Sequence, residues 1–122
     1  MKFLRNKKII LIVAIVIIAI TSFTLSNSHQ EIDFNTQVKP IINKKCITCH
    51  GGVRQQANVS LLFRDWALKK NKAGKYAIIP GDPNHSEMIR RITSNDPEDR
   101  MPYHHEPLSK EEIQVFKDWI KQ

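Results

Sequence analysis

Residues 46–50 read Cys46-Ile47-Thr48-Cys49-His50, and they contain the only two cysteines of this 122-residue chain. Two thiols three residues apart, followed directly by a histidine, form the C-x-x-C-H pattern that attaches a c-type haem. The thiols can add to the two vinyl groups on one edge of the porphyrin, and the imidazole then reaches the iron from one face. We therefore predict one covalent haem c, held by Cys46 and Cys49 and ligated by His50.

Two other readings of the same residues stay open. A disulfide between Cys46 and Cys49 would suit an oxidising compartment, although the flanking sequence lacks the βαβ pattern of thioredoxin-like proteins. A zinc site would need four ligands, namely Cys46, Cys49, His50 and one of His104 or His105. Haem is favoured over both because an export leader precedes the motif.

The composition also favours an embedded cofactor. The chain is 41% hydrophobic, but only about a third of the residues after Leu25 are hydrophobic. A soluble part of this size forms one domain. A domain with so few hydrophobic residues needs a disulfide, a metal or a cofactor to complete its core. This excludes a large two-domain enzyme.

The N-terminal residues have the form of an export signal. Basic residues within the first eight positions precede an uninterrupted apolar run over residues 9–20, and this is the layout of a secretion signal. We assign residues 1–25 to a signal peptide or membrane anchor, residues 26–31 to a linker and residues 32–122 to a monohaem cytochrome c domain. The domain is expected on the periplasmic side of the inner membrane, anchored or soluble after cleavage.

Hydrophobic periodicity predicts an all-α fold of four short helices with no convincing sheet. The first helix leads into the motif behind an N-cap at Asp33. Pro40 either kinks this helix or lies in the first turn of a regular helix that begins at Lys39. The second helix is expected over residues 61–70.

The third and fourth helices flank a long loop. Asp82 and Pro83 are expected to start the third helix, with Asp82 as its cap. Residues 94–107 contain several prolines and are predicted to form a loop. Ser109 and Glu112 form a capping box, which marks the start of the last helix.

The sixth iron ligand is predicted to be Met101. Met101 precedes Pro102 and is therefore biased toward an extended loop, from which a thioether can face the iron. Met88 has core spacing within a predicted helix, and packing explains it better. The other candidates are histidines: His85, His104, His105 and, remotely, His29.

Several further blocks accompany the motif: Phe34-x-x-x-Val38-x-Pro40-Ile41, Ile79-Pro80-Gly81-Asp82-Pro83-x-x-Ser86, Arg91-Ile92, Asp99-Arg100-Met101-Pro102, Pro107-Leu108-Ser109-x-Glu111-Glu112 and Trp119-Ile120. On these residues the chain resembles the planctomycete-type cytochrome c domain from about residue 34 to residue 120. The resemblance implies a small class I cytochrome c-like helical domain around one haem, with a histidine and a methionine on the iron. The family's methionine falls at Met101, whereas Tyr103, His104 and His105 depart from the family's pattern.

A haem iron with histidine and methionine ligands is saturated, which suits electron transfer. We therefore predict an electron carrier rather than an enzyme. If the sixth ligand can be displaced, the alternative is a gas- or peroxide-binding sensor or a peroxidase. A structural or docking haem module of a larger exported enzyme system is a further alternative.

The expected partners are redox proteins with acidic docking surfaces, attracted by Lys44, Lys45 and the lysines within residues 69–75. The N-terminal segment is expected to contact the membrane. Arg90 and Arg91 are candidates for an ion pair with a haem propionate. The net charge is +7, but much of it lies in the leader and no recognition motif accompanies the rest, so no nucleic acid is expected as a partner.

Overall fold

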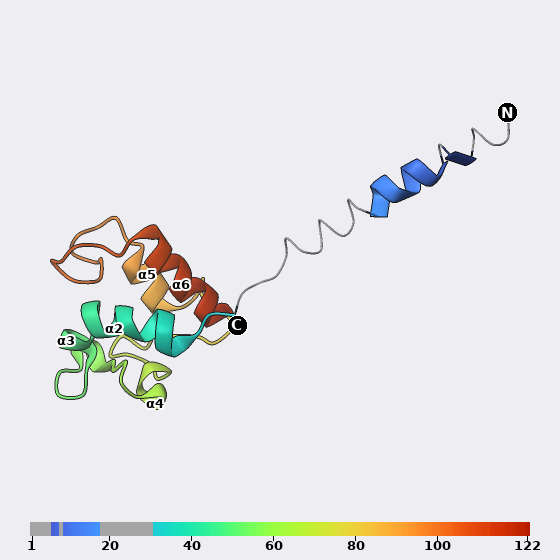
Figure 1. Cartoon of the computed structure of the whole chain (residues 1–122). Coiled ribbons are helices and arrows are strands. Elements are labelled where there is room, and N and C mark those ends of the chain that lie inside the picture. Colours follow the sequence, from blue (N-terminus) through green and yellow to red (C-terminus); the bar gives the residue numbers. More distant parts are fainter. Residues whose placement is uncertain (1–5, 8, 18–30) are drawn as a thin grey trace. The chain divides into compact units, whose positions relative to one another are not determined.

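The computed structural model describes residues 6–7, 9–17 and 31–122. It divides into two compact units, Met1–Gln30 and Glu31–Gln122 (Figure 1). Residues 9–17 of the first unit are helical, and among the described residues no helix combines the length and the apolar character needed to cross a membrane. The predicted leader and linker fall partly on residues 1–5, 8 and 18–30, which lie outside the described residues. Their roles therefore stay predictions.

The segment ahead of the motif begins as a π-helix and continues as an α-helix. Asp33 caps η1 (Phe34–Val38), and its Oδ1 accepts a hydrogen bond from Thr36 N at 2.7 Å. The helix α2 (Lys39–Lys45) follows, with Pro40 in its first turn, where the missing N–H costs no helical hydrogen bond. The predicted cap is confirmed, and of the two alternatives for Pro40 the structure has the regular helix that begins at Lys39.

Three short helical segments follow α2, namely α3 (Ile47–His50), η2 (Gln56–Asn58) and α4 (Arg64–Ala67). The helix predicted over residues 61–70 is therefore wrong in extent. Leu61 N donates to His50 O at 2.8 Å, residues 61–63 form bends, and Phe63 itself is extended, with φ −123° and ψ 127°. A long-range hydrogen bond thus overrides the local helical pattern of the sequence.

The helix α5 (Glu87–Ile92) begins later than predicted. Asp82 caps a separate turn instead, because its Oδ1 accepts from His85 N at 3.2 Å. The fully buried Ser86 closes that turn: its Oγ accepts from Ile79 N at 2.9 Å and donates to Asp82 O at 2.8 Å. The regular helix can start only after this turn.

The last helix, α6 (Lys110–Lys121), has the predicted capping box. Ser109 Oγ accepts from Glu112 N at 3.2 Å, and Ser109 N donates to Glu112 Oε2 at 2.8 Å. These two bonds satisfy backbone donors that the first turn of a helix leaves free. The predicted start of the helix is confirmed.

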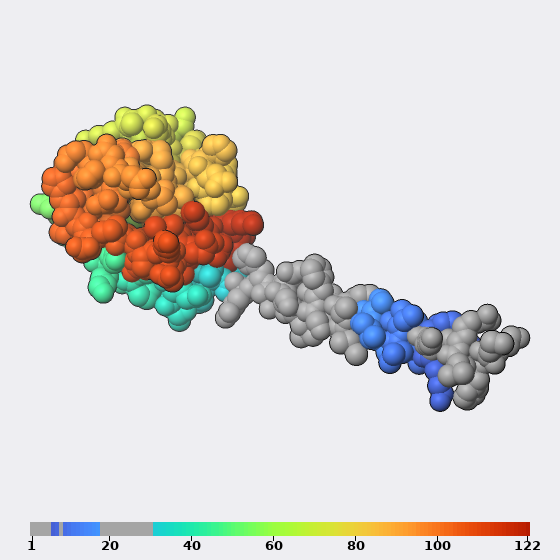
Figure 2. Space-filling view, turned by 90° about the horizontal axis from the view of Figure 1, so that it is seen from above, coloured from blue at the N-terminus to red at the C-terminus, as the bar shows by residue number. Residues whose placement is uncertain are grey.

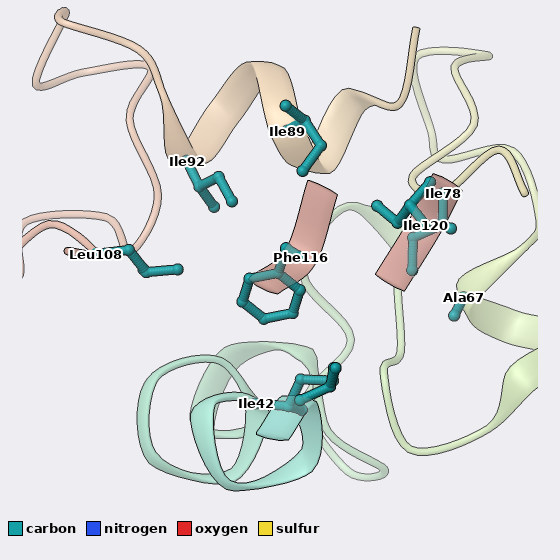
Figure 3. Close-up of a cluster of buried hydrophobic side chains, with 9 residues drawn as sticks. Ile42, Ala67, Ile78, Ile89, Ile92, Leu108, Phe116 and Ile120 are labelled. Atoms are coloured by element: carbon teal, nitrogen blue, oxygen red, sulfur yellow. The ribbon is translucent and has the colours of Figure 1, made fainter. Parts of the chain in front are cut away.

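The hydrophobic core lies between α2, α5 and α6 (Figure 3). The side chain of Phe116 on α6 is fully buried, and Ile42 of α2 and Ile89 and Ile92 of α5 lie around it. The described residues contain no strand, only isolated bridges between residues 50 and 55 and between residues 70 and 76. The all-α prediction is confirmed for this part of the chain.

Candidate haem-attachment site

The motif forms one helical turn at the junction of α2 and α3. Cys46 N donates to Ile42 O at 2.9 Å, and Cys46 O accepts from Cys49 N at 3.2 Å and from His50 N at 2.9 Å. Side chains three and four residues apart in such a turn share one side of the helix. Both cysteines are free and half-buried. The structure therefore brings together the two thiols and the imidazole that the sequence predicted to act as one site.

A backbone carbonyl orients the His50 imidazole. The Nδ1 atom of His50 lies 3.3 Å from Val59 O. Because a carbonyl oxygen can only accept, Nδ1 carries the hydrogen and Nε2 keeps its lone pair. Burial lowers the pKa of His50, which favours the neutral imidazole. A neutral histidine held through Nδ1 is the form in which Nε2 binds a metal.

The environment of Cys46 differs from that of a reactive redox thiol, and the described residues contain no zinc-type cluster. Burial raises the pKa of Cys46 to about 11, whereas the reactive thiol of a redox dithiol has a lowered pKa. No group of three or more His, Cys, Asp or Glu side chains among the described residues could hold a metal ion. His104, one candidate for a fourth zinc ligand, instead places its Nε2 3.1 Å from Glu98 Oε1.

Met101 lies in the loop between α5 and α6, and its side chain packs against the hydrophobic core. Cys46 and Met88 pack against the same core. Met101 therefore packs against the same core as the first cysteine of the motif. Met88 has the packing role predicted for it.

The competing histidines lie on the surface. His85 is exposed and pairs with Asp82 at 2.7 Å. His104 is exposed and stacks on Tyr103, with 3.9 Å between the ring centroids. His105 is also exposed, and His29 lies outside the described residues.

Comparison with known proteins places these residues in a family. The model of the family described as Planctomycete cytochrome C matches residues 46–103, from the first motif cysteine to just past Met101. This match supports a planctomycete-type cytochrome c domain over these residues. No curated protein and no solved structure matches the chain. A cytochrome c domain implies a haem c cofactor, so the remaining question is whether these residues fit one.

The arginine next to Met101 supports that fit. The Nε atom of Arg100 is buried and has no hydrogen-bond partner among the described residues. Leaving such a donor unsatisfied costs about 1–3 kcal/mol, so an acceptor is expected at this position of the cytochrome domain. The propionates of a haem are carboxylates of the required kind. The donor set of the motif and this orphaned donor both fit the group.

A cavity along the described residues lies near the motif but does not include it. It has a volume of about 610 Å³, and its walls are mostly apolar, with Arg64 as the one cationic side chain among them. Neither the motif nor Met101 lines it. It reaches Leu61, whose N–H is bonded to His50 O, so it begins close to the motif.

The structure changes the assignment of the arginines near Met101. Arg90 and Arg91 were candidates for a propionate, but both pair with Glu87 and Asp99. Sequence reasoning overlooked Arg100, although its place directly before Met101 was a usable signal. It also overlooked the Val59 carbonyl, for which the sequence holds no signal because any residue type supplies one.

The backbone beside His50 leaves no room for a side chain at Gly51. A Cβ atom there would lie 2.5 Å from Ile47 O, a backbone atom of α3. We predict that Gly51→Ala destabilises the domain by about 1–3 kcal/mol, as overpacking usually does, and lowers the yield of haem-loaded protein. Urea unfolding and the haem absorbance per protein would measure the two effects.

The neighbouring glycine provides a matched control. At Gly52 a Cβ atom would approach Leu62 Cδ1 at 3.4 Å, which is ordinary contact. Gly52→Ala should therefore behave nearly as the unmodified chain does. Equal losses in the two variants would show that the close approach at Gly51 is not what restricts this turn.

Proposed function

We propose that this chain is an exported electron carrier in which one haem c is attached through Cys46 and Cys49 and ligated by His50 and Met101. The observation that carries the proposal is the orientation of His50, whose Nδ1 is bound to Val59 O so that Nε2 is left for the iron. The half-buried thiols of the same helical turn support attachment beside it.

The bound haem would supply a one-electron couple between ferric and ferrous iron. His50 would hold one face of it in a fixed orientation, because the bond to Val59 prevents rotation of the ring. Met101 would supply a sulfur ligand, and such a ligand favours the ferrous state. The hydrophobic core, against which both Cys46 and Met101 pack, would limit access of water, which also favours the less charged state.

The leader supports export of the domain. The basic residues and the apolar run over residues 9–20 have the order of a secretion signal. Covalent attachment suits a protein outside the cytoplasm, where a released cofactor would be lost by dilution. Cell fractionation that recovers the haem-loaded chain in the cytoplasm would contradict this part of the proposal.

The sixth ligand can be tested by a pair of methionine variants. We predict that Met101→Ala abolishes the sulfur-to-iron charge-transfer band of the ferric protein, because the thioether is removed from the iron. Met88→Ala is the control: it removes a methionine that packs against the same core, and it should keep the band despite a stability cost of about 2–5 kcal/mol.

Two results would argue against the proposal. Loss of the band in Met88→Ala but not in Met101→Ala would reverse the ligand assignment. An unmodified protein that is high-spin, or that binds carbon monoxide at neutral pH, would favour a sensor or peroxidase in its place.

Arg100 is proposed to donate its buried Nε–H to a haem propionate. A positive charge near the iron stabilises the ferrous state, so we predict that Arg100→Leu lowers the reduction potential by roughly 20–60 mV, where 59 mV is a tenfold change for one electron. Arg100→Lys keeps the charge and should keep most of the potential. An unchanged potential in Arg100→Leu, measured by redox titration, would remove Arg100 from the site.

The lysines of residues 69–75 are proposed to attract an acidic redox partner. Lys72 N donates to Ala57 O at 3.0 Å, so this segment lies beside the loop that follows the motif. Lys45 is less available than the sequence suggested, because its Nζ pairs with Glu112 Oε2 at 2.9 Å.

A rate measurement tests this surface. We predict that electron transfer with an anionic redox protein slows as ionic strength rises, and that Lys72→Glu weakens this salt dependence. Lys121→Glu at the end of α6 makes the same charge change elsewhere and should weaken it less. Equal effects of the two variants would mean that net charge, rather than this surface, guides the encounter.

A further inference from the structure

Met101 belongs to a long loop, whose position depends on its contacts with the rest of the domain. The loop joins α5 to α6, and in Figure 2 it lies in orange on the same face as α6, in red. Within it, Met101 N donates to Arg91 O at 3.1 Å, next to the end of α5. This bond fixes the backbone of the methionine at one point only, and a methionine side chain has three rotatable bonds of its own.

Asp99, two residues before Met101, is bound to α5 by two arginines. Arg91 Nη1 lies 2.8 Å from Asp99 Oδ1 and 3.3 Å from the Asp99 backbone oxygen. Arg90 Nη2 donates to Asp99 Oδ1 at 3.1 Å, and Arg90 Nη1 pairs with Oδ2. Both oxygens of the carboxylate are therefore engaged by guanidinium groups, an arrangement that fixes orientation as well as position.

Glu87 holds the two arginines in place from the helix side. Arg90 Nε donates to Glu87 Oε2 at 2.8 Å and Arg90 Nη2 donates to Oε1 at 2.7 Å. Arg91 Nε donates to the same Oε1 at 3.0 Å. Glu87 is only 8% exposed, so it cannot move without leaving a charge uncompensated inside the protein. The guanidinium groups are thereby aimed at Asp99 before any ligand is present.

We propose that Asp99, Arg90 and Arg91 form a clamp that positions Met101, keeping its sulfur at the sixth coordination site against competing ligands. The inference rests on the proposed function, because it takes Met101 as the iron ligand. The three are positioning residues: they act on the iron through the loop and do not touch it. A second anchor in the same loop, from Tyr103 Oη and His104 Nε2 to Glu98, holds the nearest histidine on the surface.

Competition by added imidazole measures how well the clamp works. Imidazole can bind ferric iron only in molecules whose sixth site is vacated, so its apparent affinity reports how often Met101 is displaced. In the haem-loaded full chain, Asp99→Asn removes the carboxylate charge while keeping the side-chain shape. We expect this variant to bind imidazole about fivefold more tightly than the unmodified chain. The reason is that loss of the ion-pair network lets the loop release Met101 more often.

The matched control is Asp118→Asn on α6. Asp118 Oδ1 accepts from Gln114 Nε2 at 2.9 Å, so the control makes the same chemical change without touching the loop. It should leave imidazole affinity unchanged. If Asp99→Asn does not assemble with haem, the imidazole affinity of Arg91→Lys tests the clamp instead. Lysine keeps the positive charge, but it lacks the planar guanidinium group that contacts Asp99 and Glu87 at the same time.

The outcomes separate the clamp from the proposed function. Tighter imidazole binding in Asp99→Asn, with an intact charge-transfer band in the unmodified chain, supports the clamp. Unchanged affinity in Asp99→Asn, or an equal rise in Asp118→Asn, overturns it while leaving Met101 as ligand. Absence of the band from the unmodified chain overturns the ligand assignment and the clamp together.

Discussion

The geometry of the motif depends on two hydrogen bonds that join His50 to residues nine and eleven positions later in the chain. His50 Nδ1 is bound to Val59 O at 3.3 Å, and His50 O accepts from Leu61 N at 2.8 Å. Together they close the loop over residues 51–58. The same two bonds fix the tautomer of the imidazole and hold residues 59–61 against His50, so the state of this side chain and the local fold have one cause.

The motif lies where the first and last helices of the domain meet. Cys46 is the residue at which α2 ends, and it packs against the core shared by α2 and α6. Lys45, beside it, pairs with Glu112 in the first turn of α6. The proposed attachment point is therefore tied to both ends of the domain. In a chain with few apolar residues, a covalent cofactor at this junction would stabilise the contact between its first and last helices.

The elements that the sequence predicted well are those governed by local chemistry. The caps at Asp33 and Ser109 depend on neighbours within a few residues, and the structure has both. For Pro40 the sequence left a kink and a first-turn position open, and the structure has the latter. The start of α5 and the extent of α4 were wrong because contacts from distant residues decide them. Ser86 bonds to Ile79, and Leu61 bonds to His50, and hydrophobic periodicity carries no record of such contacts. Cys46, Cys49 and His50 are predictable as a site because their spacing alone places them in one turn.

The arginines around Met101 show why charge type alone could not assign their roles. Hydrogen bonds from Arg90 and then Arg91 lower the pKa of Glu87 to about 2, so Glu87 stays ionised near neutral pH. Its charge keeps both guanidinium groups paired with Glu87 beside their contacts with Asp99. Arg100 differs because its Nε is buried without a partner among the described residues. Of these three arginines, Arg90 and Arg91 bind the loop that contains Met101, whereas Arg100 has a buried Nε without a partner among the described residues. Their contacts and burial, rather than their positions in the sequence, make the distinction.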